Sequence, residues 1–191
     1  MSVMAGVVPN EESYFGTSVW KHARNRFPWL LFLMLSATIT GLILGHFEAA
    51  LAVMPILNTF IPMLTGTGGN CGSQSSTLII RGLTVGEIEF KDIFRVLFKE
   101  IRVALLVGLC LSMVNGVRVI IMYGDPLLAF AIGLTMIATI LLSKTVGCVL
   151  PLVAKKSRLD PAIMAAPLIT TLVDTGTILV YFAIVTRIFH I

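Results

Sequence analysis

Residues 101–154 read IRVALLVGLCLSMVNGVRVIIMY, then GDP, then LLAFAIGLTMIATILLSKTVGCVLPLVA. Each flanking run is long enough to cross the hydrocarbon core of a bilayer, which requires about 20 mainly apolar residues per helix. Gly124, Asp125 and Pro126 interrupt the apolar sequence and predict a turn between the two runs. Residues 101–154 are therefore expected to form two consecutive membrane-spanning helices.

The composition of the whole chain supports this fold class. Of the 191 residues, 57% are hydrophobic and 13% are charged, and the mean hydropathy is +0.95. A soluble domain is typically about 45–50% apolar and about 25% charged. A chain of this length can bury only one ordinary core, so lipid is expected to cover the remaining apolar surface. The predicted fold is an all-α integral membrane protein.

Three further runs of similar length bring the number of predicted membrane-spanning helices to five. The five predicted spans cover residues 27–46, 49–81, 101–123, 127–154 and 161–186. Residues 27–191 are therefore expected to form the membrane domain, and residues 1–26 a polar cytoplasmic leader. Between the second and third spans, residues 85–100 alternate charged and apolar residues at helical spacing. This pattern predicts an amphipathic helix at the membrane surface, with a docking surface for a partner domain as the alternative.

Basic residues concentrate on one side of these five spans, in the leader and in the connections before the third and fifth spans. Because Lys and Arg collect in cytoplasmic loops, the N-terminus is predicted in the cytoplasm and the C-terminus outside, in a cell membrane. Lys144 and Arg118 lie nearer to helix ends and are expected to reach the interface by snorkelling. The basic residues form no stripe with interleaved aromatics, so no nucleic-acid partner is expected.

Asp174 lies inside the fifth predicted span, roughly 20 Å along the helix from its cytoplasmic end. A charged residue at the centre of a membrane helix costs about 2.5–3.5 kcal/mol on insertion scales, so its presence requires a reason. One interpretation is a protonated carboxyl, or one paired with Lys144, that only holds helices together. The other is a carboxylate that faces water and attracts a cation. Without Cys or His nearby, a hard oxygen ligand suits Mg²⁺ or Ca²⁺.

The second predicted span contains a polar, glycine-rich segment, residues 65–75, with the sequence TGTGGNCGSQS. Its small residues, Gly69 among them, permit close approach of neighbouring helices, which is one interpretation. Packing alone does not require Asn70 and Gln74. In the second interpretation the backbone is irregular, and freed carbonyls and these two amides bind the water shell of a hydrated ion. Gly69, Asn70 and Gln74 are therefore candidates for one wall of an ion path.

A polar stripe follows one face of the last predicted span. Its members are spaced seven, four and three residues apart and are Asp160, Pro167, Thr171 and Asp174. Thr170 adds a second hydroxyl beside Thr171. Asp160, followed by proline, is first of all a helix-start signal, and its position at the cytoplasmic mouth also permits cation binding. A polar stripe from the cytoplasmic end to mid-membrane predicts half of a pore wall.

These two motifs resemble one family. Residues 68–74, GGNCGSQ, followed by Arg81-Gly82-Leu83 and Gly86-Glu87, resemble the signature of MgtE-type magnesium channels. Residues 160–162, DPA, together with residues 167–171, PLITT, and Asp174 resemble the last helix of the same family. The likeness extends from residue 14 to residue 181, which is nearly the whole chain.

The resemblance implies homodimers of five-helix subunits, with a Mg²⁺ pore on the two-fold axis lined by the second and fifth helices. It also implies that Asp174 of each subunit binds the ion in the pore and that Asp160 binds Mg²⁺ near the cytoplasmic side. MgtE-type channels usually carry a cytoplasmic region with paired CBS domains that senses Mg²⁺ and closes the pore. Here only residues 3–9 resemble the end of its linker, so the cytoplasmic regulatory domain is expected to be missing, either because this is an excised membrane domain or because the protein is naturally short. Any gating is then expected to reside in the membrane part.

The expected function is movement of largely hydrated Mg²⁺ into the cytoplasm down its electrochemical gradient, because Mg²⁺ dehydrates reluctantly. Two facing Asp174 carboxylates repel each other when empty, which favours a divalent over a monovalent ion. Asn70, Gln74 and Thr170 are expected to bind the water shell. The alternative is a secondary transporter coupled to H⁺ or Na⁺, in which Asp174 exchanges a proton.

Two other classes are less favoured by the sequence. An intramembrane enzyme requires a second catalytic carboxylate, a Ser/His pair or an HExxH pattern within the spans, and the sequence shows none. A membrane scaffold would use its polar residues only for packing. Replacement of Asp174 by Asn discriminates, because a scaffold would keep its role whereas a channel would lose Mg²⁺ flux or selectivity.

Overall fold

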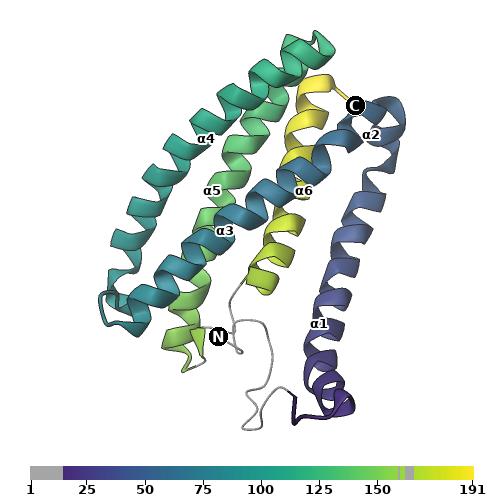
Figure 1. Cartoon of the computed structure of the whole chain (residues 1–191). Helices are drawn as coiled ribbons and strands as arrows, with labels where there is room; N and C mark the ends of the chain where they lie inside the picture. The colour runs from purple at the N-terminus through teal and green to yellow at the C-terminus, as the bar shows by residue number, and fades with distance from the viewer. Residues whose placement is uncertain (1–14, 159, 162–165) are drawn as a thin grey trace.

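A computed structural model describes residues 15–158, 160–161 and 166–191, and all regular elements in these residues are helices (Figure 1). The all-α prediction is confirmed. In chain order the elements are α1 (Val19–His46), α2 (Glu48–Val53), the 3-10 helix η2 (Pro55–Phe60), α3 (Ile61–Thr84), the 3-10 helix η3 (Phe90–Asp92), α4 (Ile93–Tyr123), α5 (Pro126–Lys156) and α6 (Ala166–Phe189).

The turn between α4 and α5 forms where the sequence predicts it. Gly124 ends α4 with φ +66°, a left-handed conformation that glycine adopts without steric cost. The Asp125 carboxylate caps α5 by accepting hydrogen bonds from the backbone N–H of Leu127 at 2.9 Å and of Leu128 at 3.0 Å. Pro126 occupies the start of α5, where its missing N–H is no loss. The two helices therefore pack side by side as an antiparallel pair.

The centre of the bundle is α5, which packs against α4 on one side and against α3 and α6 on the other. Figure 1 shows α3 running obliquely across α5 and α6. At the end of the bundle where α3 begins, Leu57 and Phe60 of η2 are buried with Tyr181 of α6. The Tyr181 hydroxyl donates to the Leu57 carbonyl at 2.8 Å. The α3–α5–α6 contacts therefore hold the two helices that carry the candidate ion-path residues.

At the edge of the bundle, α1 lies beside α6 and contributes no buried residue (Figure 1). The Thr40 and Thr175 hydroxyls share a hydrogen bond of 2.7 Å, and the rings of Phe47, which follows α1, and Phe182 stack with centroids 4.3 Å apart. The exposed apolar side chains of α1 are suited to contact with lipid rather than with water.

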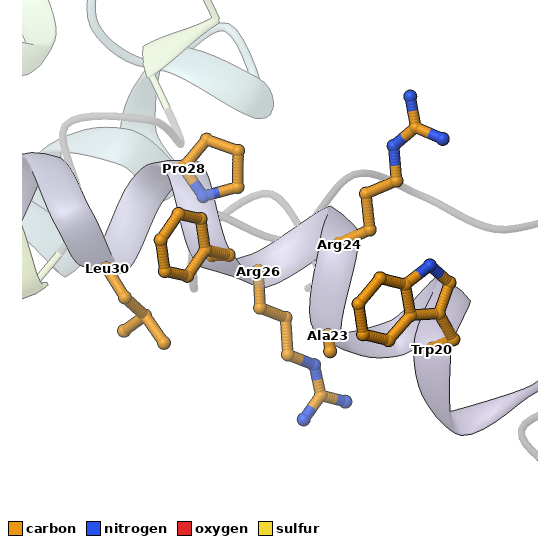
Figure 2. Close-up of a pocket in the computed structure, with 7 residues that line it drawn as sticks. Trp20, Ala23, Arg24, Arg26, Pro28 and Leu30 are labelled. Atoms are coloured by element: carbon orange, nitrogen blue, oxygen red, sulfur yellow. The ribbon is translucent and has the colours of Figure 1, made fainter.

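The first turns of α1 combine aromatic and basic residues. Arg24 and Arg26 follow Trp20 and extend to opposite sides of the helix (Figure 2). Phe27 lines the same hollow as these residues. Trp at a membrane–water interface and basic residues on the cytoplasmic side are typical of a membrane-helix end. A hollow of about 590 Å³ at this position is lined by residues of α1 and by none of the candidate ion-path residues. It therefore belongs to the helix end rather than to the candidate site.

The predicted span over residues 49–81 is divided in the structure. The short helix α2 ends before Met54, whose φ of −133° and ψ of 78° are not helical, and Pro55 then starts η2. The glycine-rich segment, in contrast, is a continuous part of α3. The expected irregular backbone with freed carbonyls is wrong, because close packing of the glycines against α5 and α6 stabilises an uninterrupted helix.

The predicted amphipathic helix over residues 85–100 does not form as a separate element. Gly86 has φ +76°, and the Gly82 carbonyl accepts the backbone N–H groups of Glu87 at 2.9 Å and Ile88 at 3.1 Å. The chain then turns through η3, and α4 starts at Ile93 and runs for 31 residues. Residues 93–100 are thus the first two turns of a span that was expected to begin at residue 101.

Among the described residues, four helices are long and apolar enough to cross a membrane: Val19–His46, Phe90–Tyr123, Pro126–Lys156 and Pro167–Phe189. The remaining long helix, α3, has 24 residues but is less apolar because of its Gly, Ser and Thr content, so the predicted count of five spans stays a prediction. The protein is therefore a multi-helix membrane protein in which α3 differs from the other long helices in the polarity of its surface.

Candidate ion path on α3 and α6

Helix α3 has two distinct faces. Gly68, Gly69 and Gly72 are buried against neighbouring helices, whereas Asn70 and Gln74 are exposed. Thr77, also exposed, follows at a spacing of three residues, which places it on the Asn70–Gln74 face. The two interpretations of the glycine-rich segment therefore apply to different faces of one helix.

The glycine face brings α3 unusually close to α5 and α6. An ideal Cβ on Gly68 would lie 2.9 Å from side-chain carbons of both Thr139 and Val173, and one on Gly72 would lie 2.9 Å from the Ser143 hydroxyl oxygen. The Ser143 hydroxyl donates a short hydrogen bond to the Gly68 carbonyl. Because a side chain at Gly68 or Gly72 would displace these neighbours, close approach is the physical reason for glycine at both positions.

Gly69 joins the two predicted motifs. A Cβ at this position would lie 2.9 Å from Thr170 Cγ2, so the α3 backbone rests against the Thr170 side chain of α6. Asp174 follows Thr170 by one helical turn and therefore lies on the same side of α6. The structure thus brings Gly69 and Thr170 together, one turn from the candidate ion ligand.

On its polar face, α3 forms an open groove of about 620 Å³. Its lining is Asn70, Ser73, Gln74, Thr77 and Leu78. The two amides and three hydroxyl or aliphatic side chains carry no charge, and the polar ones both donate and accept hydrogen bonds. No described residue of α6 lines this groove, so one chain does not bring Asn70 or Gln74 into a common pocket with Asp174. Thr77 and Ser73 were not predicted as site residues, although their spacing from Asn70 and Gln74 indicates the same face.

Asp174 is half-buried on α6. Within the described residues its carboxylate has no hydrogen bond and no ion pair. The interpretation in which Asp174 pairs with Lys144 is wrong, because the Lys144 ammonium lies 3.4 Å from a carboxylate oxygen of Glu100 instead. An unpaired carboxylate in an apolar helix is costly unless water or a cation reaches it.

The hydroxyls of Thr170 and Thr171 both donate to the Pro167 carbonyl at 2.9 Å. Such bonds are common in helices, because a carbonyl oxygen has two lone pairs and can accept from a hydroxyl three or four residues later as well as from the backbone. The hydroxyl protons are thereby occupied, while the hydroxyl oxygens keep lone pairs that accept hydrogen bonds. Such acceptors suit the protons of water molecules around a cation.

Asp160 is exposed and lies beside Pro161. The predicted helix start at residue 161 and the next residues, 162–165, fall partly outside the described residues, and the described part of α6 begins at Ala166. The roles of Asp160 as helix cap and as cation ligand therefore stay predictions.

Lys144 is buried between helices and does not extend to an exposed surface. It is 5% exposed, and its ammonium donates to the Ser75 hydroxyl at 3.1 Å and to Glu100 Oε2 at 3.4 Å. The expected snorkelling is wrong because an acidic partner lies at the same depth. The sequence holds a signal for this pair, since Glu100 lies 24 residues before Gly124 and Lys144 lies 20 residues after it. An antiparallel pair of helices that turns at Gly124 brings two such positions to similar depth.

In the part of the chain that the structure describes, no three His, Cys, Asp or Glu side chains come together as a metal-ligand group. The fold and the site define a multi-pass membrane protein. Within its described residues, the Asp174 carboxylate on α6 has no hydrogen bond or ion pair and lies one turn from the contact with α3. A family model described as a divalent cation transporter, MgtE, matches residues 61–184. The chain belongs to the MgtE family.

Three curated relatives, each called magnesium transporter MgtE, are similar to most of this chain. The protein from Bacillus subtilis is 37% identical over 92% of the chain, that from Thermus thermophilus 38% over 83%, and that from Enterococcus faecalis 32% over 96%. These matches cover 39%, 35% and 40% of the relatives. The chain thus spans about two fifths of the length of these proteins, and the resemblance to the MgtE family is confirmed.

Proposed function

We propose that this chain forms the ion-conducting part of a Mg²⁺ channel, with Mg²⁺ as its substrate. The observation that supports the proposal most strongly is the unpaired Asp174 carboxylate, one turn from the Gly69–Thr170 contact between α3 and α6. A scaffold would not require an unpaired acid at this position, because uncompensated charge within a membrane is unfavourable.

The path is complete, in this proposal, only in a homodimer with the pore on its two-fold axis. One chain supplies a single Asp174 and an open polar groove on α3 that lipid would solvate poorly. A second copy would cover this groove and add a second Asp174, which doubles the negative charge that faces the ion. Five spans per subunit, counting α3, then place the N-terminus in the cytoplasm and the C-terminus outside.

Mg²⁺ passes this site with most of its water shell. Its waters are tightly held, so the path is suited to accepting hydrogen bonds from the water shell rather than to direct ligation. The acceptors are the amide oxygens of Asn70 and Gln74 in the groove and the hydroxyl oxygen of Thr170 on α6. The paired carboxylates attract the ion and disfavour a monovalent competitor, which neutralises only half of their charge. Flux follows the electrochemical gradient into the cytoplasm, and Asp160 provides a second cation ligand at the inner mouth.

Mg²⁺ uptake into liposomes that contain the purified chain tests the proposal. Asp174→Asn keeps the size of the side chain and removes its charge, so we expect uptake to fall by at least about tenfold, the factor that corresponds to about 1.4 kcal/mol of ion stabilisation. Asp125→Asn is the matched control, because asparagine also caps helices and Asp125 lies at the α4–α5 turn. Equal uptake by the wild type and Asp174→Asn would contradict the proposal.

The alternative of coupling to H⁺ or Na⁺ is distinguished in the same preparation. Unitary currents in single-channel recordings support a channel, since a coupled carrier moves too few ions per cycle to give discrete current steps. A fixed ratio of H⁺ or Na⁺ to Mg²⁺ would instead indicate a secondary transporter, in which Asp174 is the candidate for proton exchange where H⁺ is the coupled ion.

A further inference from the structure

A buried charged cluster lies behind the polar face of α3. It consists of Ser75 on α3, Glu100 on α4 and Lys144 on α5. The Ser75 hydroxyl donates to Glu100 Oε2 at 2.5 Å, and the Lys144 ammonium donates to both partners. Each of three helices thus contributes one member, and all three side chains are buried, with Glu100 9% exposed.

The cluster does not belong to the candidate ion path. Ser75 is buried, whereas its neighbour Gln74 is exposed in the groove. A separate cavity of about 600 Å³ reaches Glu100 and Lys144 from the side of α4 and the loop that precedes it, where Glu87 and Arg95 contribute to the lining. The cluster therefore borders a cavity on the side of α4 and joins α3 on the face opposite to the groove.

Stability alone does not explain a buried ion pair in this position. The desolvation of two charges offsets much of their attraction, and replacement of both partners by apolar residues is often neutral or stabilising. The pair instead constrains how the helices are oriented. Hydrogen bonds between two helices form only at a suitable relative rotation and axial displacement of those helices. The glycine contacts set how closely α3 approaches its neighbours, and the hydrogen bonds of Ser75 additionally depend on the rotation of α3.

Two successive residues of α5 hold α3 at two levels. Ser143 bonds to the Gly68 carbonyl, and Lys144 bonds to Ser75, which lies two turns further along α3. Asn70 and Gln74 lie between these two attachments along α3 and are exposed, on the face opposite to the buried Gly68 and Ser75. A rotation of α3 would turn both amides, and the groove that they line, to another side of the bundle and would break the Ser75 contacts at the same time.

We propose that Ser75, Glu100 and Lys144 are positioning residues that fix the rotation of α3 and thereby hold Asn70 and Gln74 toward the ion path. The proposal rests on the function proposed above for its effect on transport. Its structural part, the orientation of Gln74, is independent of whether Mg²⁺ is the substrate. The two parts therefore require separate measurements.

Thiol accessibility measures the orientation directly. In a chain with Cys71, Cys110 and Cys148 replaced by Ala, Gln74→Cys is labelled with a water-soluble thiol reagent in liposomes. Addition of the apolar pair Glu100→Met and Lys144→Met is expected to lower the labelling rate about tenfold, because a small displacement of a positioned group has a large effect on its reaction. Unchanged labelling in a folded double variant overturns the proposal.

Transport and stability readouts separate positioning from general destabilisation. In the chain with its native cysteines, we expect the same Met pair to keep its unfolding temperature in detergent but to lose about tenfold in maximal Mg²⁺ uptake. The charge swap Glu100→Lys with Lys144→Glu is expected to restore uptake, since the Ser75 hydroxyl can both donate and accept. If the charge-swap variant folds but restores neither labelling nor uptake, the proposal is overturned. This test also holds if the Met pair itself fails to fold.

Asn115→Leu is the matched control. Asn115 is a buried polar residue of α4, like Glu100, but its amide oxygen accepts a hydrogen bond from Arg118 at 3.0 Å instead of contacting Ser75. We expect it to leave Gln74→Cys labelling unchanged, and an equal decrease in this control would attribute the effect to loss of any buried polar group. If the wild type moves no Mg²⁺, the proposed function fails, while labelling still decides whether the cluster orients α3.

Discussion

The two polar regions of α3 differ in charge, burial and partners although they lie within one turn of each other. The front region, Asn70, Gln74 and Thr77, is exposed and uncharged. The rear region centres on Ser75, which is buried between the charged groups of Glu100 and Lys144. Polar residues in a membrane helix can thus serve an aqueous surface or a contact between helices, and burial in the folded chain distinguishes the two uses.

The comparison predicts that loss of a single partner of the ion pair at the rear lowers the free energy of unfolding, whereas substitutions at the front change transport and leave stability nearly unchanged. The largest effect is expected for Glu100→Ala, which leaves the Lys144 ammonium buried without its acid. Loss of one partner of a buried ion pair costs about 3–5 kcal/mol. The loss in free energy of unfolding is measured by thermal unfolding in detergent, with the double variant Glu100→Met and Lys144→Met as the comparison. If the single variant is no less stable than the double, the pair is not desolvated as the structure indicates.

A smaller loss is expected for Gly72→Ala, on the rear face of α3. Its Cβ would lie 2.7 Å from Ile169 Cγ2, and such overpacking costs about 1–3 kcal/mol. Gly66→Ala is the matched control, because a Cβ there meets nothing within 4 Å. Alanine is the better helix former by about 0.5–1 kcal/mol, so Gly66→Ala should be neutral or stabilising. Equal unfolding temperatures for the two variants would contradict the close packing of α3 against α6.

Thr40→Val tests a neutral contact against the charged cluster. It removes the 2.7 Å hydrogen bond to Thr175 between α1 and α6. Hydrogen bonds between membrane helices average about 0.6 kcal/mol, so the expected shift in unfolding free energy is several times smaller than for Glu100→Ala. A loss as large as that of Glu100→Ala would show that α1 depends on this contact far more than its exposed surface indicates.

The smallest effect on stability is expected for Gln74→Leu on the front face, because this side chain is exposed and has no partner in the groove. We expect the unfolding free energy to change by less than about 0.5 kcal/mol, as is usual for exposed sites. Mg²⁺ uptake should nevertheless fall, since leucine cannot bind the water shell. Uptake equal to that of the wild type would remove Gln74 from the proposed path.

Local chemistry was sufficient to predict several elements from the sequence. Apolar runs long enough for a bilayer predict the long helices, and the Gly124-Asp125-Pro126 turn follows from the left-handed glycine, the capping carboxylate and the proline without an N–H. The resemblance of two motifs to the MgtE family was confirmed by the comparisons with known proteins. These features depend on neighbours within a few residues, or on the order of motifs along the chain.

Only the tertiary structure decided which polar groups meet. The sequence shows Lys144 in one span and Glu100 before another, but it does not show that Lys144 pairs with Glu100 rather than Asp174. Likewise, the glycine-rich segment predicted an interrupted helix, and its packing against α5 and α6 keeps it regular. The physical reason is that composition determines whether a helix enters the membrane, whereas the partners of a buried charge depend on the rotation and depth at which helices from distant parts of the chain pack.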